Sequence, residues 1–333
     1  MKVVVLTTSY PRNPRDTAGR FVADAVGAVR AQGVSVEVVS PASFPHFGLA
    51  FGDGLVQNLR AAPWRAAFAP AFLAAFARAA RRAARDADLV HAHWIPAALA
   101  ARATGKPYVL QVWGTDVDLA RRAPAIARPL VRGARVVVAA SGFLADAAKD
   151  LGARAVEVVP AGVRVPADVP EPDEPPHVLF AGRLSPEKGI EEFVVATEGL
   201  QRRIAGDGPL RARVPEAAGF VPPGEIGAWF GRAALVCVPS RREGYGVVAR
   251  EALAWGRPVV TTGVGGLRDL SEGVRAVPPG DVVALRAAVV ALLEDRAERR
   301  RLGAAGRAYA LERLSLDREA VGLIGAYHQA LHA

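Results

Sequence analysis

The stretch DLVHAHWIPAALAARATGKPYVLQVW, residues 88–113, shows the pattern that decides the fold. Residues 88–93 form a short apolar run, residues 95–104 have the spacing of a helix, and residues 107–113 form a second apolar run. Strands that are buried on both faces of a sheet read as continuous Val, Leu and Ile runs, because helices cover both faces. The stretch therefore predicts one strand–helix–strand unit of a parallel sheet.

The same alternation extends in both directions along the chain. We predict further strands at 2–7, 34–40, 134–139, 155–159, 177–181, 201–205, 234–239 and 257–261, and helices at 19–32, 64–85, 187–198, 246–255, 281–294 and 316–331. Residues 166–177 interrupt the pattern with five prolines and four acidic residues, and because proline removes backbone donors they are predicted to be an interdomain linker. We therefore expect an α/β protein of two doubly wound, Rossmann-like domains that face each other across a ligand-binding cleft.

The composition excludes several classes of protein. With 333 residues, 51% hydrophobic and 23% charged, the chain is long enough for two cores and is not of the disordered type. Cys237 is the single cysteine, which excludes an intrachain disulfide and a cysteine-based zinc site and fits a reducing cytoplasm. Because Met1 leads directly into an apolar strand and no uncharged apolar run approaches the about 20 residues of a membrane span, we expect a soluble or peripheral cytoplasmic protein.

Positive charge is concentrated in the first half of the chain. Residues 1–165 carry 21 Lys and Arg against 11 Asp and Glu, whereas residues 166–333 carry 21 against 22. Such an asymmetry is typical of a domain that binds an anionic partner: nucleic acid, an anionic membrane or an acidic substrate. Solvated surface arginines explain it about equally well. Aromatic residues, at 7%, are too few for stacking on bases, so no nucleic-acid partner is expected.

The segment EGYGVVARE, from Glu243 to Glu251, is the strongest indication of function. A glycine-bearing turn separates the two glutamates and leads into a predicted helix. The free N–H groups of Gly246, Val247 and Val248 would lie at the N-terminus of that helix, where unpaired donors and the helix dipole bind phosphate. Glu243 is expected to project into the cleft beside them. A surface loop with two incidental glutamates is the alternative, and the Pro-Ser that precedes the loop argues against it.

A second motif, GRLSPEKG at residues 182–189, follows the first strand of the second half. Arg183 offers a planar fork of donors and Lys188 a point charge, and together they suit a diphosphate. A solvated basic turn is the less favoured interpretation, because the motif lies at a strand end that faces the expected cleft. The turn at Gly206 follows the next strand, and its glycine allows positive φ or close approach of a ligand. Asp-Gly turns are common, so this third motif is weak by itself.

Polar residues in the first half also lie at the ends of predicted strands or in the loops after them. Gly19 begins a helix and would let the backbone approach a ligand. His91 and His93 share one face of a strand, where a histidine is more often structural than catalytic. Asp116 and Asp118 have the Asp-x-Asp form that metal-dependent transferases use, but this form is short and isolated, so we expect a metal-independent site. No G-x-G-x-x-G or Walker A sequence supports a dehydrogenase or a P-loop enzyme.

In combination these motifs resemble the retaining glycosyltransferases of family 4, which have the GT-B fold. The resemblance covers nearly the whole chain and rests on these motifs: Ser9-Tyr10-Pro11, Gly19, His91-Ala-His93-Trp94, Gly114-Thr-Asp116, Pro160-Ala-Gly162-Val163, Gly182-Arg183, Pro186-Glu-Lys188-Gly189, Gly206-Asp-Gly-Pro209, Pro239-Ser-Arg-Arg-Glu243-Gly-Tyr245-Gly246, Glu251-Ala252 and Gly265-Gly266. It implies an acceptor-binding domain at 1–165, a donor-binding domain at 178–315 and a last helix, 316–333, that crosses back to the first domain.

The resemblance also implies roles for single residues. The donor-binding residues would be Gly19, Arg183, Lys188, Gly206, Tyr245, Gly246, Val247, Val248 and Glu251, and the catalytic candidates are Glu243, His91, His93 and Asp116. Arg183 and Lys188 would hold the phosphates of a UDP- or GDP-sugar, with no cofactor, and would stabilise the leaving group. Glu243 would touch the sugar and Glu251 the ribose. The acceptor would be a glycolipid, a polysaccharide or a small molecule. A lipid-linked acceptor at the inner face of an anionic membrane would account for the basic first half and for the Phe-, Leu- and Arg-rich segment 64–82.

The chain departs from the family pattern at two positions. Trp113 stands where many relatives have a histidine that contacts the sugar, so His91 or His93 would take over that role, and Ala161 replaces the usual asparagine. A nucleotide-sugar epimerase of the same fold, which turns over donor without an acceptor, is one alternative. A degenerate protein that binds nucleotide or anionic lipid without chemistry is another, and the intact charged residues Arg183 and Glu243 argue against it.

Overall fold

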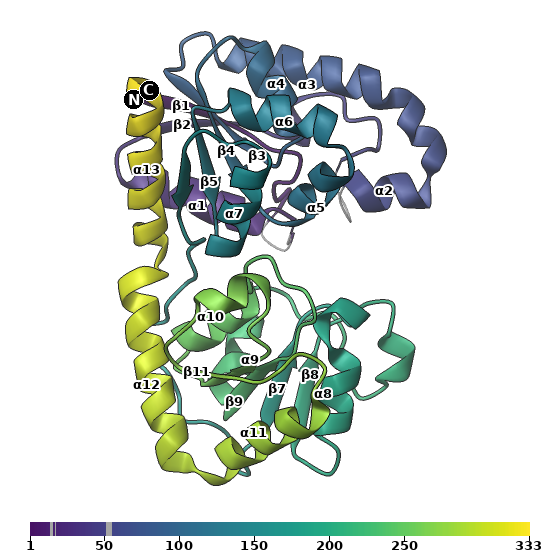
Figure 1. Ribbon diagram of the computed structural model, residues 1–333, viewed down its shortest axis with the longest axis vertical. Helices are drawn as coiled ribbons and strands as arrows, with labels where there is room; N and C mark the ends of the chain where they lie inside the picture. The colour runs from purple at the N-terminus through teal and green to yellow at the C-terminus, as the bar shows by residue number, and fades with distance from the viewer. Residues whose placement is uncertain (14–15, 17, 51–54) are drawn as a thin grey trace. The chain divides into compact units, whose positions relative to one another are not determined.

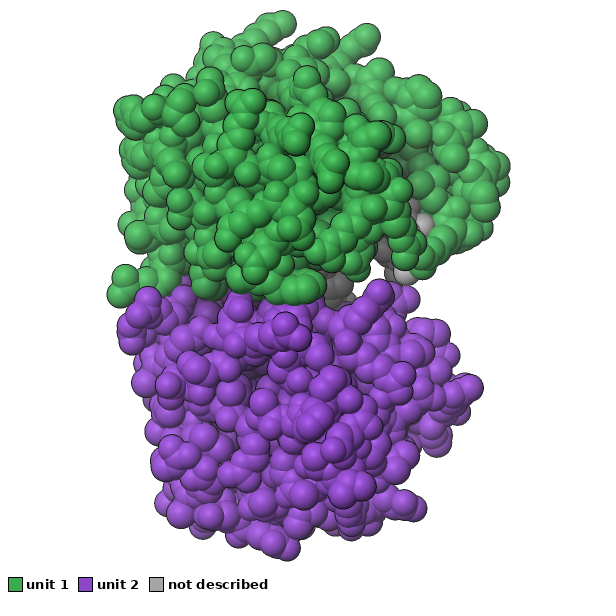
Figure 2. Space-filling model, viewed as in Figure 1, with its two compact units in different colours: residues 1–162, 316–333 green, residues 163–315 purple. Residues whose placement is uncertain are grey.

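The computed structural model describes residues 1–13, 16, 18–50 and 55–333, which divide into two compact units (Figure 2). Unit 1 comprises residues 1–162 and 316–333, and unit 2 comprises residues 163–315. The proline-rich segment 166–177, which we predicted as a linker, lies within unit 2. Positions 14, 15 and 17, in the loop that we expected before the first helix, lie outside the described residues.

Unit 1 is built on a six-stranded parallel sheet with the order β2-β1-β3-β4-β5-β6 (Figure 1). Its strands are β1 (Lys2–Leu6), β2 (Ser35–Val39), β3 (Leu89–His93), β4 (Tyr108–Val112), β5 (Val136–Ala139) and β6 (Val156–Val158). Its α-helices are α1 (Arg20–Ala31), α2 (Leu55–Ala61), α3 (Ala69–Ala83), α4 (Ala97–Ala103), α5 (Thr115–Arg122), α6 (Pro124–Gly133), α7 (Gly142–Asp150) and α13 (Leu316–His332).

One face of this sheet is covered by helices from opposite ends of the sequence. Val3 and Val5 of β1 belong to one buried cluster with Val26 of α1 and with Leu323 and Tyr327 of α13. Figure 1 shows α13, in yellow, running along the strands of unit 1. Since α1 and α13 also pack against each other, the last helix completes the core of the first unit.

Unit 2 is built on a five-stranded parallel sheet with the order β11-β10-β9-β7-β8. Its strands are β7 (Val178–Ala181), β8 (Arg202–Ala205), β9 (Leu235–Val238), β10 (Val259–Thr261) and β11 (Val274–Ala276). Its α-helices are α8 (Ile190–Ala196), α9 (Ile226–Arg232), α10 (Val247–Ala254), α11 (Val282–Glu294) and α12 (Arg296–Arg313). Helices α8 and α11 pack in the buried cluster on one face of this sheet, and α9, α10 and α12 pack in the cluster on the other face. Two parallel, doubly wound sheets are therefore present, and the predicted fold class is confirmed.

Helix α12 was missed by the sequence analysis, although with 18 residues it is long. Its sequence is rich in Arg and contains Gly303 and Gly306, and both features weaken the apolar period from which a helix is predicted. The glycines allow close packing: a Cβ on Gly303 would lie 2.2 Å from the carbonyl oxygen of Gly256, and one on Gly306 would lie 2.6 Å from the Leu253 side chain.

The helix predicted at 64–85 is also corrected. Residues Pro63–Phe68 form a 3₁₀ helix, and α3 begins only at Ala69, because Pro70 fits the first turn of an α-helix better than its interior. None of the helices among the described residues is long and apolar enough to span a membrane.

Candidate active site

Four loops meet at the carboxyl edge of the unit 2 sheet. They follow β7, β8, β9 and β10, which are neighbours in the order β10-β9-β7-β8. The strands are parallel, so their carboxyl ends lie along one edge, which is where ligands bind to open α/β sheets. The loops after β7 and β9 contain the two motifs with which the sequence analysis associated phosphate and sugar binding.

Glycines join these loops by main-chain contact. A Cβ on Gly189 would lie 2.0 Å from the carbonyl oxygen of Pro239, and one on Gly265 would lie 1.8 Å from that of Glu243. Both glycines have positive φ, 70° and 54°, a region that favours glycine. A side chain at either position would force neighbouring loops apart, so these positions require glycine.

Gly206 belongs to the same set. We predicted that this glycine allows positive φ or close approach of a ligand, and its φ is 152°. A Cβ on Gly206 would lie 1.8 Å from the carbonyl oxygen of Gly182, so the close approach is to the backbone of the adjacent loop. The main-chain N–H of Leu184 also donates to the Asp207 carbonyl at 2.9 Å, which ties the loops after β7 and β8 together.

The joined loops bring two separate motifs into contact. Lys188 Nζ donates to Glu243 Oε2 at 2.7 Å, although 55 residues separate them in sequence. Ser240 Oγ donates to the same carboxylate oxygen at 3.4 Å. Both charged side chains stay partly open to solvent, with 31% of Lys188 and 14% of Glu243 exposed. The predicted phosphate-binding cation and the predicted sugar-binding carboxylate thus form a single charged pair.

The loops after β7 and β9 carry two further sources of positive charge. Arg183 is exposed and has no hydrogen bond or ion pair within the described part of the chain. Helix α10 starts after Gly246, which has φ 85°, and no side chain caps it. Over the described residues no hydrogen bond is found for the main-chain N–H groups of Val247 and Val248. A helix N-terminus with unpaired donors carries a partial positive charge, so it suits an anion.

Arg250 is a residue of this site that the sequence analysis missed. Its side chain is 1% exposed, and its guanidinium donates to the carbonyl oxygens of Tyr245 and Gly266, the latter at 3.1 Å. It also lies 3.7 Å from the centre of the Tyr245 ring, which is itself buried. Arg250 therefore links Tyr245 to the turn at Gly266. The available signal was a basic residue inside the mostly apolar sequence VVAREALA of α10.

Glu251 lies one position further along α10 and is partly buried. Burial raises the pKa of its carboxyl group from 4.5 to about 7. Within the residues that the structure describes, the Glu251 carboxylate has no hydrogen-bond or ion-pair partner. A half-buried carboxyl group without a partner is costly to charge, and hydroxyl donors of a ligand would relieve that cost.

The two histidines predicted as catalytic candidates are buried in the core of unit 1. His91 and His93 are each 1% exposed, and His91 Nδ1 lies 2.9 Å from the Tyr327 hydroxyl of α13. Burial lowers the pKa of His91 to about 3 and, together with the neighbouring His91, holds the pKa of His93 well below its usual value. Both imidazoles are therefore neutral at pH 7 and enclosed by unit 1, and their contact with a substrate stays a prediction.

Asp116, another predicted catalytic candidate, is buried and bonded to the main chain. Its carboxylate accepts three main-chain hydrogen bonds: from Trp113 and Gly114 at 3.0 Å each and from Ile95 at 3.2 Å. It thereby ties the end of β3 to the start of α5. Burial raises the pKa of this carboxyl group, against the effect of the three donors. A carboxylate occupied in this way is poorly placed to transfer a proton.

Aromatic rings pack around Trp113, the residue at which the chain departs from the expected pattern. The Trp113 Nε1–H donates to His93 Nδ1 at 3.3 Å, and the two rings are stacked. Phe21 packs on Trp113 with ring centres 4.3 Å apart. Trp94 follows β3 with φ 69°, a strained value for a side chain of this size, and strain of this kind is found at functional sites.

Gly19 serves a main-chain contact as well. It has φ 67° at the start of α1, and a Cβ there would lie 2.1 Å from the Ser9 carbonyl oxygen. The close approach seen here is between two segments of the protein, and the approach of a ligand to Gly19 stays a prediction. No group of three or more His, Cys, Asp or Glu that could hold a metal ion is found in the described part of the chain.

Each half of the chain matches the model of a known protein family. Residues 18–165 match the model of "Glycosyltransferase Family 4", and residues 175–295 match the model of "Glycosyl transferases group 1". The D-inositol 3-phosphate glycosyltransferase of Xylanimonas cellulosilytica is 32% identical, and the match covers 73% of this chain and 72% of that protein. Glycogen synthase of Mycobacterium tuberculosis is 30% identical over 69% of this chain and 65% of its own length.

Solved structures agree on the fold. Sucrose-phosphate synthase from Thermosynechococcus elongatus superposes with a TM-score of 0.81 at 20% identity, over 99% of this chain and 98% of that one. Anabaena HepE, solved in complex with UDP and glucose, superposes with a TM-score of 0.72 at 18% identity, over 98% of this chain and 99% of that one. These likenesses show the GT-B fold class.

Proposed function

Because this chain belongs to the family 4, or group 1, glycosyltransferases, we propose that it moves a sugar from a nucleoside-diphosphate sugar to an acceptor with retention of the anomeric configuration. The donor would be a UDP- or GDP-sugar that binds at the carboxyl edge of the unit 2 sheet. Support for such a donor comes from HepE, a protein of the same fold that was solved with UDP and glucose.

The ion pair of Lys188 and Glu243, at 2.7 Å, is the observation that carries this proposal. In a nucleoside-diphosphate sugar the outer phosphate is bonded directly to the anomeric carbon of the sugar. A cation that holds this phosphate and a carboxylate that accepts from the sugar hydroxyls must therefore lie next to each other. Lys188 and Glu243 meet that requirement, and the donor would replace their direct contact with one contact to each.

The neighbouring groups have distinct tasks in this proposal. Arg183, Lys188 and the N-terminus of α10 would neutralise the diphosphate and stabilise the charge that grows on it as the glycosidic bond breaks. Glu251 would accept hydrogen bonds from the ribose hydroxyls. We propose that these cations replace a metal ion. His91, His93 and Asp116 would support the end of the unit 1 sheet and would not exchange protons.

Unit 1 would bind the acceptor, which we propose to be lipid-linked and reached at the inner face of an anionic membrane. Trp64 is 67% exposed, its neighbour Phe68 stacks on Phe47 with ring centres 5.7 Å apart, and the Arg65 guanidinium lies 5.6 Å from the Trp64 ring. Exposed aromatics beside arginine are typical of interfacial segments. If Trp64→Ala/Phe68→Ala protein floats with phosphatidylglycerol vesicles as well as wild type does, the membrane contact lies elsewhere.

The donor site is tested by thermal unfolding with a panel of nucleoside diphosphates in the presence of a chelator. Ligand at about 100 times its dissociation constant should stabilise the fold by ~2.7 kcal/mol. Arg183→Ala should weaken nucleoside-diphosphate binding by ~1.5–3 kcal/mol, the usual value of a hydrogen bond to a charged group. Stabilisation that appears only with added divalent cation would contradict the metal-independent site.

Glu243→Ala should abolish sugar transfer without unfolding the protein, because the side chain lies at a partly open edge. Glu225→Ala, which removes an exposed glutamate of the same unit, is the matched control and should transfer normally. Near-wild-type transfer by Glu243→Ala would contradict the site. Release of an isomerised nucleotide sugar without acceptor would assign an epimerase instead, and binding without any turnover would assign a degenerate protein.

A further inference from the structure

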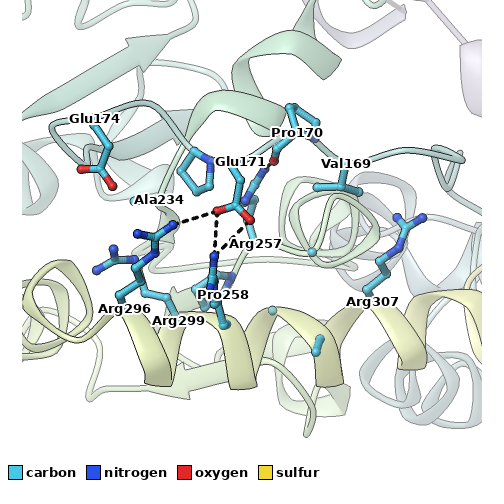
Figure 3. A pocket seen from close by; sticks show the side chains of 15 residues that line it. Val169, Pro170, Glu171, Glu174, Ala234, Arg257, Pro258, Arg296, Arg299 and Arg307 are labelled. Carbon is cyan, nitrogen blue, oxygen red and sulfur yellow. Dashed lines mark hydrogen bonds and ion pairs between the residues drawn. The ribbon is translucent and has the colours of Figure 1, made fainter.

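Each unit has an arginine-rich hollow at the amino ends of its strands, the edge of the sheet opposite the loops described above. The hollow of unit 2 lies beside Ala234 and Pro258, the residues that precede β9 and β10, and measures about 210 Å³ (Figure 3). The hollow of unit 1 lies beside Tyr108, Arg135 and Ala155, at the starts of β4, β5 and β6, and measures about 780 Å³.

The arginines of the unit 2 hollow all have hydrogen-bond or ion-pair partners within the protein. Arg257, Arg299 and Arg307 donate to main-chain carbonyl groups, and Arg296 and Arg300 pair with Glu171. The carbonyl groups include those of Pro166 and Pro170, so these side chains attach the proline-rich segment to the body of the unit. Figure 3 shows Glu171 in the centre with the dashed ion pairs converging on it. This hollow is a structural network.

The unit 1 hollow has the same kind of side chains, with fewer partners among the described residues. Five cationic residues line it, Arg102, Lys106, Arg132, Arg135 and Arg154, and none of its lining residues is Asp or Glu. Arg135 donates to the main-chain oxygen of Ala333 at 2.8 Å. For the other four side chains, no hydrogen bond or ion pair is found over the residues that the structure describes.

Helix ends explain only part of this charge. Arg102 and Arg132 lie in the last turns of α4 and α6, where cations are favoured because each helix C-terminus carries about half a negative charge. Arg135 is bonded to Ala333, so two such ends, about one charge, stand against the four other cations. Lys106 and Arg154 belong to loops and gain nothing from a last-turn position. Several positive charges therefore remain uncompensated inside one concave surface.

We propose that the unit 1 hollow binds a small polyanion that carries several phosphate groups. Guanidinium groups present paired donors that match phosphate oxygens, and several of them around one cavity favour a ligand with more than one phosphate. The volume falls within the range of small-molecule sites, ~300–1,000 Å³. Exposed aromatics of unit 1, such as Trp64 and Phe143, do not line the hollow. The phosphates would come from a free polyphosphorylated molecule or from anionic lipid headgroups.

The experiment titrates inorganic tripolyphosphate into the full chain at low ionic strength by calorimetry. Arg132→Gln/Arg154→Gln removes two unpaired charges while keeping the exposed aliphatic stems. Its matched control, Arg78→Gln/Arg122→Gln, removes two exposed arginines of unit 1 that lie outside the hollow. The first variant should bind at least about tenfold more weakly, since charge-assisted hydrogen bonds are lost, and the control should bind within about twofold of wild type. Circular dichroism checks that both variants are folded.

The outcomes distinguish the unit 1 hollow from the site at Arg183, and lipid headgroups from a free polyanion. Flotation with phosphatidylglycerol vesicles that is lost in Arg132→Gln/Arg154→Gln, but kept in the control, would support the proposal with lipid headgroups as the source. Selective loss of tripolyphosphate binding with unchanged flotation would support it with a free polyanion. Equal weakening in both variants, or loss only in Arg183→Ala, would overturn it, and so would tighter binding of an oligonucleotide at the same residues.

Discussion

Both sheets carry polar residues at their carboxyl edges. In unit 2 these side chains stay partly open to solvent, whereas in unit 1 they are buried. In unit 2 the loops are joined by main-chain contacts at glycines such as Gly189 and Gly265, so Arg183, Lys188 and Glu243 remain partly open. In unit 1 the Asp116 side chain joins the loops, and the histidines of β3 are enclosed. A polar side chain that supplies the protein's own hydrogen bonds is not available to a substrate, so glycine in the linking positions leaves charged groups for chemistry.

The largest effect is expected when the glycine linkage of unit 2 is broken. In Gly265→Ala the new methyl group would lie 1.8 Å from the Glu243 carbonyl oxygen at a φ of 54°. The loop that carries Glu243 must then move, so we expect transfer to be lost and the free energy of unfolding to fall by ~4 kcal/mol or more. Denaturant unfolding and a transfer assay measure the two effects.

Gly280→Ala is the matched control for this change. Gly280 also has positive φ, 80°, but a Cβ there would meet nothing within 4 Å. Only the conformational cost of ~1–2 kcal/mol remains, and transfer should continue. Equal losses in the two variants would mean that positive φ, and not the contact between loops, explains the glycine.

A smaller effect is expected from Asp116, which links the loops of unit 1. Asp116→Ala leaves three main-chain N–H groups without their acceptor and should lower the free energy of unfolding by ~3 kcal/mol. Asp116→Asn keeps an acceptor oxygen, so it should recover most of the stability and the activity. The exposed Asp118→Ala serves as a control near zero. A stable Asp116→Asn protein without activity would return Asp116 to a catalytic role.

The smallest effect is expected at Glu251, where a substitution should raise stability and lower the affinity for a nucleoside diphosphate. Its folded-state pKa of about 7 lies above the ordinary 4.5, so the charged form is penalised in the fold and stability is lost as the pH rises from 4.5 through 7. Glu251→Gln removes that loss and should stabilise the protein by ~1 kcal/mol at pH 8, a figure kept low because the side chain is partly exposed. The gain should vanish at pH 5.

The same Glu251→Gln variant should bind a nucleoside diphosphate more weakly, by about tenfold, because a neutral amide is a poorer acceptor for ribose hydroxyls. Gain of stability with loss of affinity is the expected mark of a residue kept for function. Unfolding at pH 5 and pH 8 measures the gain of stability, and a binding titration measures the loss of affinity. Unchanged affinity would leave the buried carboxyl group without an explanation at this site.

Much of the fold could be predicted from short-range patterns. Apolar runs such as residues 88–93 and 107–113 gave strands that the structure confirms within a residue or two, because period and burial are local properties of a sequence. The resemblance to family 4, which rested on motifs such as residues 243–251, is confirmed by the sequence comparisons. Helix α12 could not be predicted, since its Gly303 and Gly306 are explained by contacts with residues far away in the chain.

The candidate site shows the same division residue by residue. Glu243 and Lys188 were found because each stands in a motif after a strand. Asp116 also stands in a motif after a strand, and His91 lies near the end of one, so their positions in the sequence do not separate them from the first pair. Burial by Tyr327 of α13 and hydrogen bonds from the main chain separate the two groups, and both depend on how distant segments pack.

The sequence by itself determined the parallel α/β architecture, the family and the charged motifs at the strand ends. The reason is that the apolar period, the placement of glycines and the charge are local properties of the sequence. The tertiary structure alone decided which charged groups stay open and that Gly206 and Gly265 contact neighbouring loops. It also decided that, among the described residues, the arginines of one basic hollow have partners while most cations of the other have none. The physical reason is that burial and pairing depend on neighbours in space, and residues 55 or more positions apart become neighbours only when the chain folds.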